Sequence, residues 1–132
     1  MNTLEGKITT IKNKGSLSIV EVDVSGILFN TIIIESPKTA SYLKEGNAIK
    51  LIFKETEVVV GKGVNHPISI QNQAIGKIEK IEKGELLSKL KIDISIGKVI
   101  AIITTDALHI LKLELGEQVT TMIKTTEIML SE

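Results

Sequence analysis

The chain contains no cysteine, no arginine and no tryptophan, and only three of its 132 residues are aromatic: Phe29, Tyr42 and Phe53. Without cysteine the chain can form no disulfide, no thiolate metal site and no cysteine nucleophile. Without arginine, any anion site must rely on lysine, hydroxyl groups and backbone N–H groups instead of the bidentate guanidinium fork. The scarcity of aromatic rings argues against a surface that stacks on nucleic-acid bases.

The chain also has no excess of positive or negative charge, because sixteen lysines balance sixteen acidic residues. A net charge of zero gives no bulk attraction to nucleic acid or to an anionic membrane. No apolar run approaches the roughly 18 residues of a membrane-spanning helix, and the N-terminal residues lack the apolar core of a signal peptide. We therefore expect a cytoplasmic, soluble protein with no membrane or nucleic-acid partner.

What the chain does contain is a repeat. The phrases FKETEVVV (53–60) and IKTTEIML (123–130) lie seventy positions apart, and the same shift aligns most of the chain with itself without a gap. About sixteen of about sixty aligned positions are identical, and most of the others exchange one apolar residue for another. The sequence therefore predicts two copies of one unit, residues 1–62 and 71–132, joined by a turn-rich linker at 63–70.

Each unit is predicted to consist of short strands. Residues 18–24 (SIVEVDV) and 90–96 (LKIDISI) alternate apolar and polar side chains, and the apolar residues of the chain are mostly Ile, Leu and Val. The segment after the third strand opens with an N-cap candidate, Ser36 or Asp106, and a glycine ends it, which predicts a short helix. We expect an all-β protein of two tandem five-stranded OB-like barrels, each with a short helix between strands 3 and 4.

Polar donors gather at predicted strand ends. Lys54 and Lys124 each end a fourth strand, and Lys124 is followed by Thr125 and Thr126. Thr104 ends the third strand of the second unit, next to the short helix. Hydrogen-bond donors without matching acceptors suit the binding of an ionised oxyanion. The alternative, on residue types alone, is that these lysines and threonines are ordinary solvated residues of a hairpin.

The motifs also resemble a known family. Asn-x-Leu-x-Gly-Lys-Ile opens the first unit, an Ile-Ile-Thr stretch ends the third strand of the second, and Lys-Thr-Thr-Glu-Ile-Met closes the second unit. This order resembles the molbindins, the molybdate-binding Mop domains of the TOBE group, here in tandem. The resemblance implies a binding protein, not an enzyme, that stores or buffers molybdate or tungstate. It also implies a homo-oligomer, a trimer of two-domain chains, with the oxyanion held between domains.

The resemblance implies a set of oxyanion-binding residues, with no metal ligand contacting the metal directly. In the second unit they come from the segment before the first strand, from the end of the third strand and from the closing phrase. The first unit contributes one lysine. The set is Ser69, Gln71, Asn72, Thr104, Lys124, Thr125 and Lys54.

The chain departs from the family pattern at defined positions. Gln71 stands where the family has arginine, so one positive charge is missing. In the first unit Ile34 replaces Thr104, and Glu55 follows Lys54 where Thr125 follows Lys124. A carboxylate beside an oxyanion repels it, so we expect the first unit to contribute mainly Lys54 and backbone donors, or to be structural.

Other functions remain as alternatives. The domain type also occurs as a regulatory or assembly module, so a protein partner is the main alternative. An OB-type nucleic-acid binder is less favoured, because that function needs exposed aromatic residues and a basic groove. An enzyme is least favoured, because neither His66 nor His109 stands in a carboxylate–histidine–nucleophile pattern. Asp23 and Asp93 recur at matched strand ends, where a turn role is expected.

Overall fold

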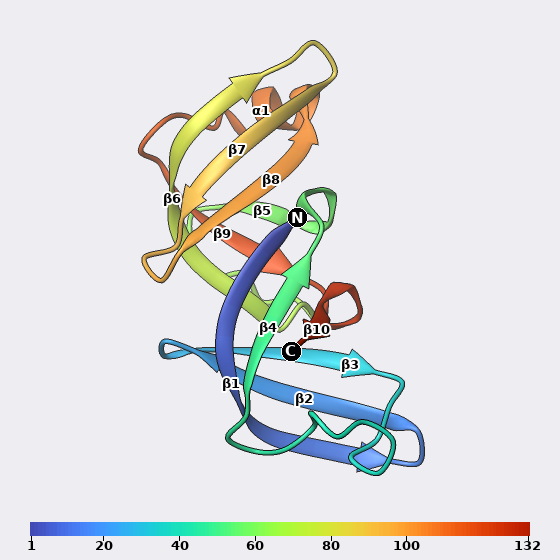
Figure 1. The fold of residues 1–132 in the computed structure, drawn as a ribbon. Coiled ribbons are helices and arrows are strands. Elements are labelled where there is room, and N and C mark those ends of the chain that lie inside the picture. Colours follow the sequence, from blue (N-terminus) through green and yellow to red (C-terminus); the bar gives the residue numbers. More distant parts are fainter.

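A computed structural model describes all residues from 1 to 132, and it is almost entirely β (Figure 1). The first half contains β1 (Asn2–Lys14), β2 (Leu17–Val24), β3 (Ile27–Ile33), β4 (Ala48–Phe53), the 3₁₀ turn η1 (Glu55–Glu57) and β5 (Val59–Lys62). The second half contains β6 (Asn72–Lys83), β7 (Leu87–Asp93), β8 (Lys98–Thr104), the helix α1 (Thr105–Leu111), β9 (Gln118–Ile123), the 3₁₀ turn η2 (Thr125–Glu127) and β10 (Met129–Ser131). This all-β architecture with two five-stranded sheets confirms the expected fold class.

The sequence repeat is also a structural repeat. Strand β1 pairs with β4 from Asn2↔Phe53 onward, and β6 pairs with β9 from Asn72↔Ile123 onward, which is the same register shifted by seventy residues. The long first strand of each repeat carries an irregularity at the same place, between Ile8 and Thr10 in β1 and, seventy residues later, between Ile78 and Lys80 in β6. A bulge bends a strand, so one strand can run through both ends of a small curved sheet.

The fifth strands are exchanged between the repeats. Strand β5 pairs with β9 of the second repeat, and β10 pairs with β4 of the first. The sheet orders are therefore β10-β4-β1-β2-β3 and β5-β9-β6-β7-β8. Each repeat gives four strands to one sheet and one strand to the other, so the second sheet is built from the consecutive strands β5 to β9, whereas the first combines β1 to β4 with β10 from the far end of the chain. In Figure 1 β10, at the C-terminus, lies beside β4 in the lower sheet.

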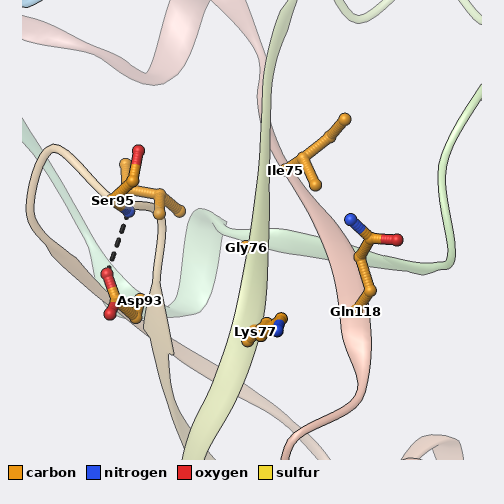
Figure 2. A pocket seen from close by; sticks show the side chains of 7 residues that line it. Ile75, Gly76, Lys77, Asp93, Ser95 and Gln118 are labelled. Carbon is orange, nitrogen blue, oxygen red and sulfur yellow. Dashed lines mark hydrogen bonds between the residues drawn. The ribbon is translucent and has the colours of Figure 1, made fainter.

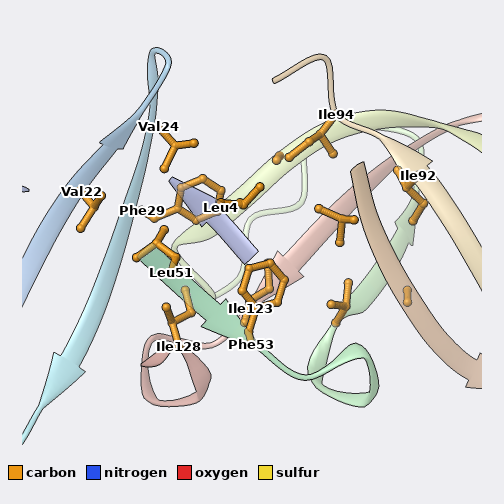
Figure 3. Packing of buried hydrophobic residues seen from close by; sticks show 14 of the residues in the cluster. Leu4, Val22, Val24, Phe29, Leu51, Phe53, Ile92, Ile94, Ile123 and Ile128 are labelled. Carbon is orange, nitrogen blue, oxygen red and sulfur yellow. The ribbon is translucent and has the colours of Figure 1, made fainter. Parts of the chain in front are cut away.

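The exchange joins the two halves around one hydrophobic core. Alternation along β2 buries Val20, Val22 and Val24 and leaves the residues between them on the other face. Near the junction of the halves, Phe53 and Ile123 lie close to Ile128 (Figure 3). All three belong to a single cluster of 25 buried residues drawn from both sheets. A unit of about sixty residues buries too little surface to be stable when it folds alone. The core shared by both repeats supplies the additional burial.

The expected helix forms only in the second repeat. Helix α1 is capped by Thr104, whose side-chain oxygen accepts a hydrogen bond from Ala107 N, so the prediction that Asp106 is the N-cap was wrong by two residues. In the first repeat, residues 36–46 form turns, and the predicted helix there was wrong. Thr39 Oγ1 donates to Ser36 O and accepts from Ser36 N, so these side chains compete with a helical ladder. No helix of the structure has the length and apolar character needed to cross a membrane.

Candidate functional site

The repeated phrase is the point at which each repeat crosses into the other sheet. Lys54 directly follows β4 and Lys124 directly follows β9, both with nearly the same extended backbone (φ −73°, ψ 145° and φ −63°, ψ 146°). Three residues later, Glu57 N donates to Lys54 O and Glu127 N donates to Lys124 O, each at 3.0 Å. A single 3₁₀ turn therefore redirects the chain into the exchanged strand. The phrase occurs twice because each repeat makes the same crossing.

An open hollow of about 220 Å³ lies where the two phrases meet. It is lined by Lys54, Glu57, Thr126, Glu127 and Met129. Two carboxylates face one ammonium there, so the hollow favours no anion in a single chain. Of the seven predicted site residues, only Lys54 lines this hollow.

The donors of the second repeat gather at a different point, the end of β9. Asn72 is the Cα partner of Ile123, so Gln71 and Lys124 continue from the same end of this strand pair. Lys124 and Gln71 are exposed, and so is Ser69, two residues before Gln71, whereas Thr125 is half-buried. Lys124 forms no ion pair in the structure, since none of the six ion pairs found includes it. This end of the sheet therefore presents an unpaired ammonium beside hydroxyl and amide groups.

The side chain of Asn72 is not part of that exposed set, because it is fully buried. Its Oδ1 accepts from Asn30 N at 2.6 Å, and its Nδ2 donates to Asn30 O at 2.8 Å and to Ile123 O at 2.9 Å. Asn2 makes the matching pair with Ile100, as acceptor at 2.8 Å and donor at 2.9 Å. The conspicuous asparagine that opens each repeat thus clamps it to the edge strand of the other.

Thr104 lies apart from the lysine-containing end. It caps α1 at the end of β8, and its Cα partner in β7 is Leu87. Strand β8 packs against η1, whereas η2, which follows Lys124, packs against β3. Within one chain, Thr104 therefore belongs to the junction that contains the first phrase, and Lys124 to the junction that contains the second.

Two contacts of these junctions were not anticipated from the sequence. Thr31 Oγ1 contacts the Thr125 carbonyl oxygen at 3.3 Å and donates to Ile128 O at 2.7 Å. These contacts tie the turn η2 to strand β3. In the first repeat, Glu55 Oε2 forms an ion pair with the N-terminal ammonium of Met1 at 3.6 Å. The shift of seventy residues, which aligns Glu55 with Thr125 and Met1 with Gln71, is the signal that identifies this second contact.

A second hollow, of about 270 Å³, lies beside the turn after β7 (Figure 2). Asp93 Oδ1 accepts a hydrogen bond from Ser95 N at 2.9 Å, so Asp93 has the predicted turn role. This hydrogen bond, together with one from Lys98, lowers the pKa of the Asp93 carboxyl. Lys98 is itself paired with Glu79 at 2.8 Å, and the two carboxylates raise its pKa. The carboxylate of this hollow is thus already paired with Lys98, whereas Lys77, which also lines the hollow, forms no ion pair.

Comparison with known proteins agrees with this architecture. A TOBE domain model matches residues 68–130. A solved structure described as the cytoplasmic molybdate-binding protein ModG, with molybdate bound, superposes with a TM-score of 0.91 at 19% identity, covering 98% of this chain and 94% of that one. A molybdate-binding protein from Sporomusa ovata matches at 30% identity over 51% of this chain and 100% of its own, with a TM-score of 0.49. No curated protein sequence matches the chain.

The ModG superposition extends over both sheets and so shows the fold of the whole chain, while the TOBE match is confined to the second repeat, which holds Lys124 and Thr125. Residues 68–130 of this chain belong to the TOBE domain family, and the chain as a whole has the two-sheet fold of ModG.

Proposed function

We propose that the protein binds molybdate or tungstate and serves to store or buffer the metal oxyanion, with no catalytic step. The observation that carries the proposal is the set of uncompensated donors at the end of β9, Lys124 and Thr125, within a TOBE domain. The ModG structure, which has the same fold, is described as holding molybdate. We place the protein in the cytoplasm, the compartment given in the description of ModG.

The chemistry of these donors fits a fully ionised oxyanion. An ammonium and a hydroxyl group donate hydrogen bonds, and molybdate is a dianion that offers only acceptor oxygens. Each charge-assisted hydrogen bond contributes about 1.5–3 kcal/mol, which offsets part of the cost of removing the ion from water. Phosphate is partly protonated at neutral pH, so its P–OH group would lack an acceptor in such a site.

We assign the residues as follows. Lys124 and Thr125 bind the oxyanion directly, Gln71 and Ser69 contribute donors from the segment that precedes β6, and Asn72 holds that segment in place. Gln71 supplies an amide in place of a charged group, so the site depends more heavily on Lys124 than an arginine-containing site would.

We infer that Thr104 and Lys54 become part of the oxyanion site only when copies of the chain assemble. Because Thr104 lies at the opposite junction of its own chain, we infer that it reaches the oxyanion bound by Lys124 only from a neighbouring copy, in a homo-oligomer such as a trimer. Exposed apolar side chains around α1 support a contact surface there, namely those of Leu86, Leu87 and Ile110. Lys54, which carries no ion pair, adds positive charge to the same junction.

Calorimetric titration with molybdate, tungstate and sulfate tests the proposal. We expect molybdate and tungstate to bind far more tightly than sulfate, since the larger ions fill a site that the smaller one leaves loose. Loss of one charge-assisted hydrogen bond in Lys124→Ala should weaken binding by about 10- to 150-fold. Lys89→Ala, which removes an exposed lysine of β7, is the matched control and should bind as the parent does. Absence of heat with every oxyanion would refute the function.

A further inference from the structure

The two junctions have the same backbone but different chemistry at one position. The turn after Lys54 and the turn after Lys124 share their dihedral angles and their closing hydrogen bond. The strand pairs that lead into them share one register, with Asn2 opposite Phe53 and Asn72 opposite Ile123. Residue 55 therefore stands in the first repeat where residue 125 stands in the second.

In the first repeat, that position carries a carboxylate that points at the start of β1. Glu55 Oε2 forms an ion pair with the N-terminal ammonium of Met1 at 3.6 Å, and the Glu55 side chain is 23% exposed. Met1 is the counterpart of Gln71, one residue before the clamping asparagine. The first repeat thus places an anionic oxygen beside the N-terminal ammonium, whose nitrogen corresponds in position to Gln71 N, on the residue that directly follows Lys54.

We propose that the Glu55 carboxylate occupies, in the first repeat, the place that the oxyanion takes in the second, so that only the second repeat binds the ion. This inference rests on the proposed function. An internal carboxylate pairs with the ammonium group at the start of β1 and repels a dianion from the turn that follows Lys54. Thr125, at the matched position, leaves the donors of its junction free. Duplication of the unit has therefore produced one open site and one closed by its own side chain.

The test compares molybdate stoichiometry by calorimetry in two backgrounds. In the parent chain, Lys124→Ala should leave no site of the parent's affinity, because the first repeat is closed and the second is weakened by about 10- to 150-fold. Glu55→Thr, which copies residue 125 into the first repeat, should double the number of ions bound per chain. Adding Lys124→Ala to Glu55→Thr should then return the stoichiometry to the parent value, with the ion held by Lys54. Glu57→Gln removes a carboxylate from the same turn and should leave the stoichiometry unchanged.

Distinct outcomes overturn the inference and the function. If the parent chain binds molybdate but Glu55→Thr gains no ions while its unfolding temperature matches that of the parent, Glu55 does not close the first repeat. If Lys124→Ala retains half of the bound ions in the parent background, the first repeat is already open and the inference is wrong. If Glu57→Gln gains bound ions as Glu55→Thr does, the total negative charge of the turn excludes the ion, and the position of the carboxylate at residue 55 does not. If no variant and no parent chain binds, the proposed function itself fails.

Discussion

The side-chain amide of Asn72 and the backbone of Asn30 form a closed pair of hydrogen bonds, 2.6 and 2.8 Å long, between strands of different sheets. Asn30 belongs to β3, the outer strand of its sheet, whose backbone groups have no further strand to pair with. Edge strands are sites of unwanted pairing unless they are covered. Asn72 therefore both joins the repeats and closes an edge, and Asn2 does the same at Ile100 of β8.

Replacing Asn72 with alanine should destabilise the whole protein. The change removes three hydrogen bonds and leaves buried groups of Asn30 and Ile123 without partners. We expect a loss of roughly 2–4 kcal/mol in the free energy of unfolding, measured with urea. Asn13→Ala is the control: it also removes three hydrogen bonds, but from an exposed asparagine near the end of β1, so it should cost less. An Asn72→Ala protein as stable as this control would show that the clamp contributes nothing.

Much of the fold was predictable from the sequence, but the strand exchange was not. Alternation in β2 and the match at a spacing of seventy residues indicated the repeats directly. The last strand, however, finds the same register on either partner: Val59 pairs with Met122 of β9, and Met129 pairs with Ile52 of β4. Since β4 and β9 are copies of each other, no residue of β5 or β10 distinguishes its own sheet from the other one.

The same limit applies to the candidate site. The proximity of Gln71 to Lys124 follows from strand order and was within reach of sequence reasoning. The role of Asn72 could not be predicted, because an asparagine that recurs in both repeats fits an anion donor and a structural clamp equally well until its hydrogen-bond partner is known. That partner is the backbone of Asn30 in the other sheet, and backbone groups carry no mark in the sequence. The helix expected after Ser36 failed for a local reason, competition from short hydroxyl side chains.

Gly76, in the Gly-Lys-Ile motif, should be essential for packing. A β-carbon on Gly76 would lie 2.6 Å from Asp93 O and 2.8 Å from Ile92 Cγ2, so β6 and β7 would have to separate. We expect Gly76→Ala to cost about 1–3 kcal/mol of unfolding free energy, as overpacking does. In Gly97→Ala, the added carbon meets only Leu4 Cδ2 at 3.4 Å, an ordinary contact, and stability should change little. Equal urea midpoints for the two variants would contradict this explanation of the motif.

The ion pair between Lys62 and Glu117 should make the exchanged strand β5 sensitive to acid. The hydrogen bond from Lys62, with a smaller part from Glu114 N, lowers the pKa of the Glu117 carboxyl. A lowered pKa means that the stabilisation is present above the ordinary pKa of 4.5 and is lost as the pH falls through the lowered value. Both side chains are partly exposed, so the contribution at neutral pH is only about 0.2–1 kcal/mol.

This prediction is checked by measuring the unfolding free energy against pH for the parent and for Glu117→Gln. The two curves should differ at neutral pH and converge in acid, because the parent loses the ion pair there. Glu114→Gln removes a neighbouring exposed carboxylate that has no ion-pair partner, so its curve should follow that of the parent. A constant difference between the parent and Glu117→Gln at every pH would indicate a packing effect instead of an ion pair.

Tyr42 gives the protein a built-in probe of the first repeat, because it is the only tyrosine and there is no tryptophan. Desolvation, followed by the hydrogen bond to Glu35 and the negative charges of Glu35 and Glu132, raises its pKa from 10.0 to about 12. Its hydroxyl donates to Glu35 Oε1 at 2.9 Å. A raised pKa means that the stabilisation is complete below pH 10.0 and is lost as the pH rises through about 12.

Tyrosinate absorbance should therefore titrate in the folded protein near the raised value, and circular dichroism should show that the fold persists below it. Glu35→Gln removes the charge but not the burial, so the midpoint should fall only part of the way toward the ordinary tyrosine value. Glu45→Gln, at an exposed position of the following turn, should leave the midpoint unchanged. A midpoint at the ordinary value in the folded parent would mean that Tyr42 is in water and does not pack against the hydrophobic core.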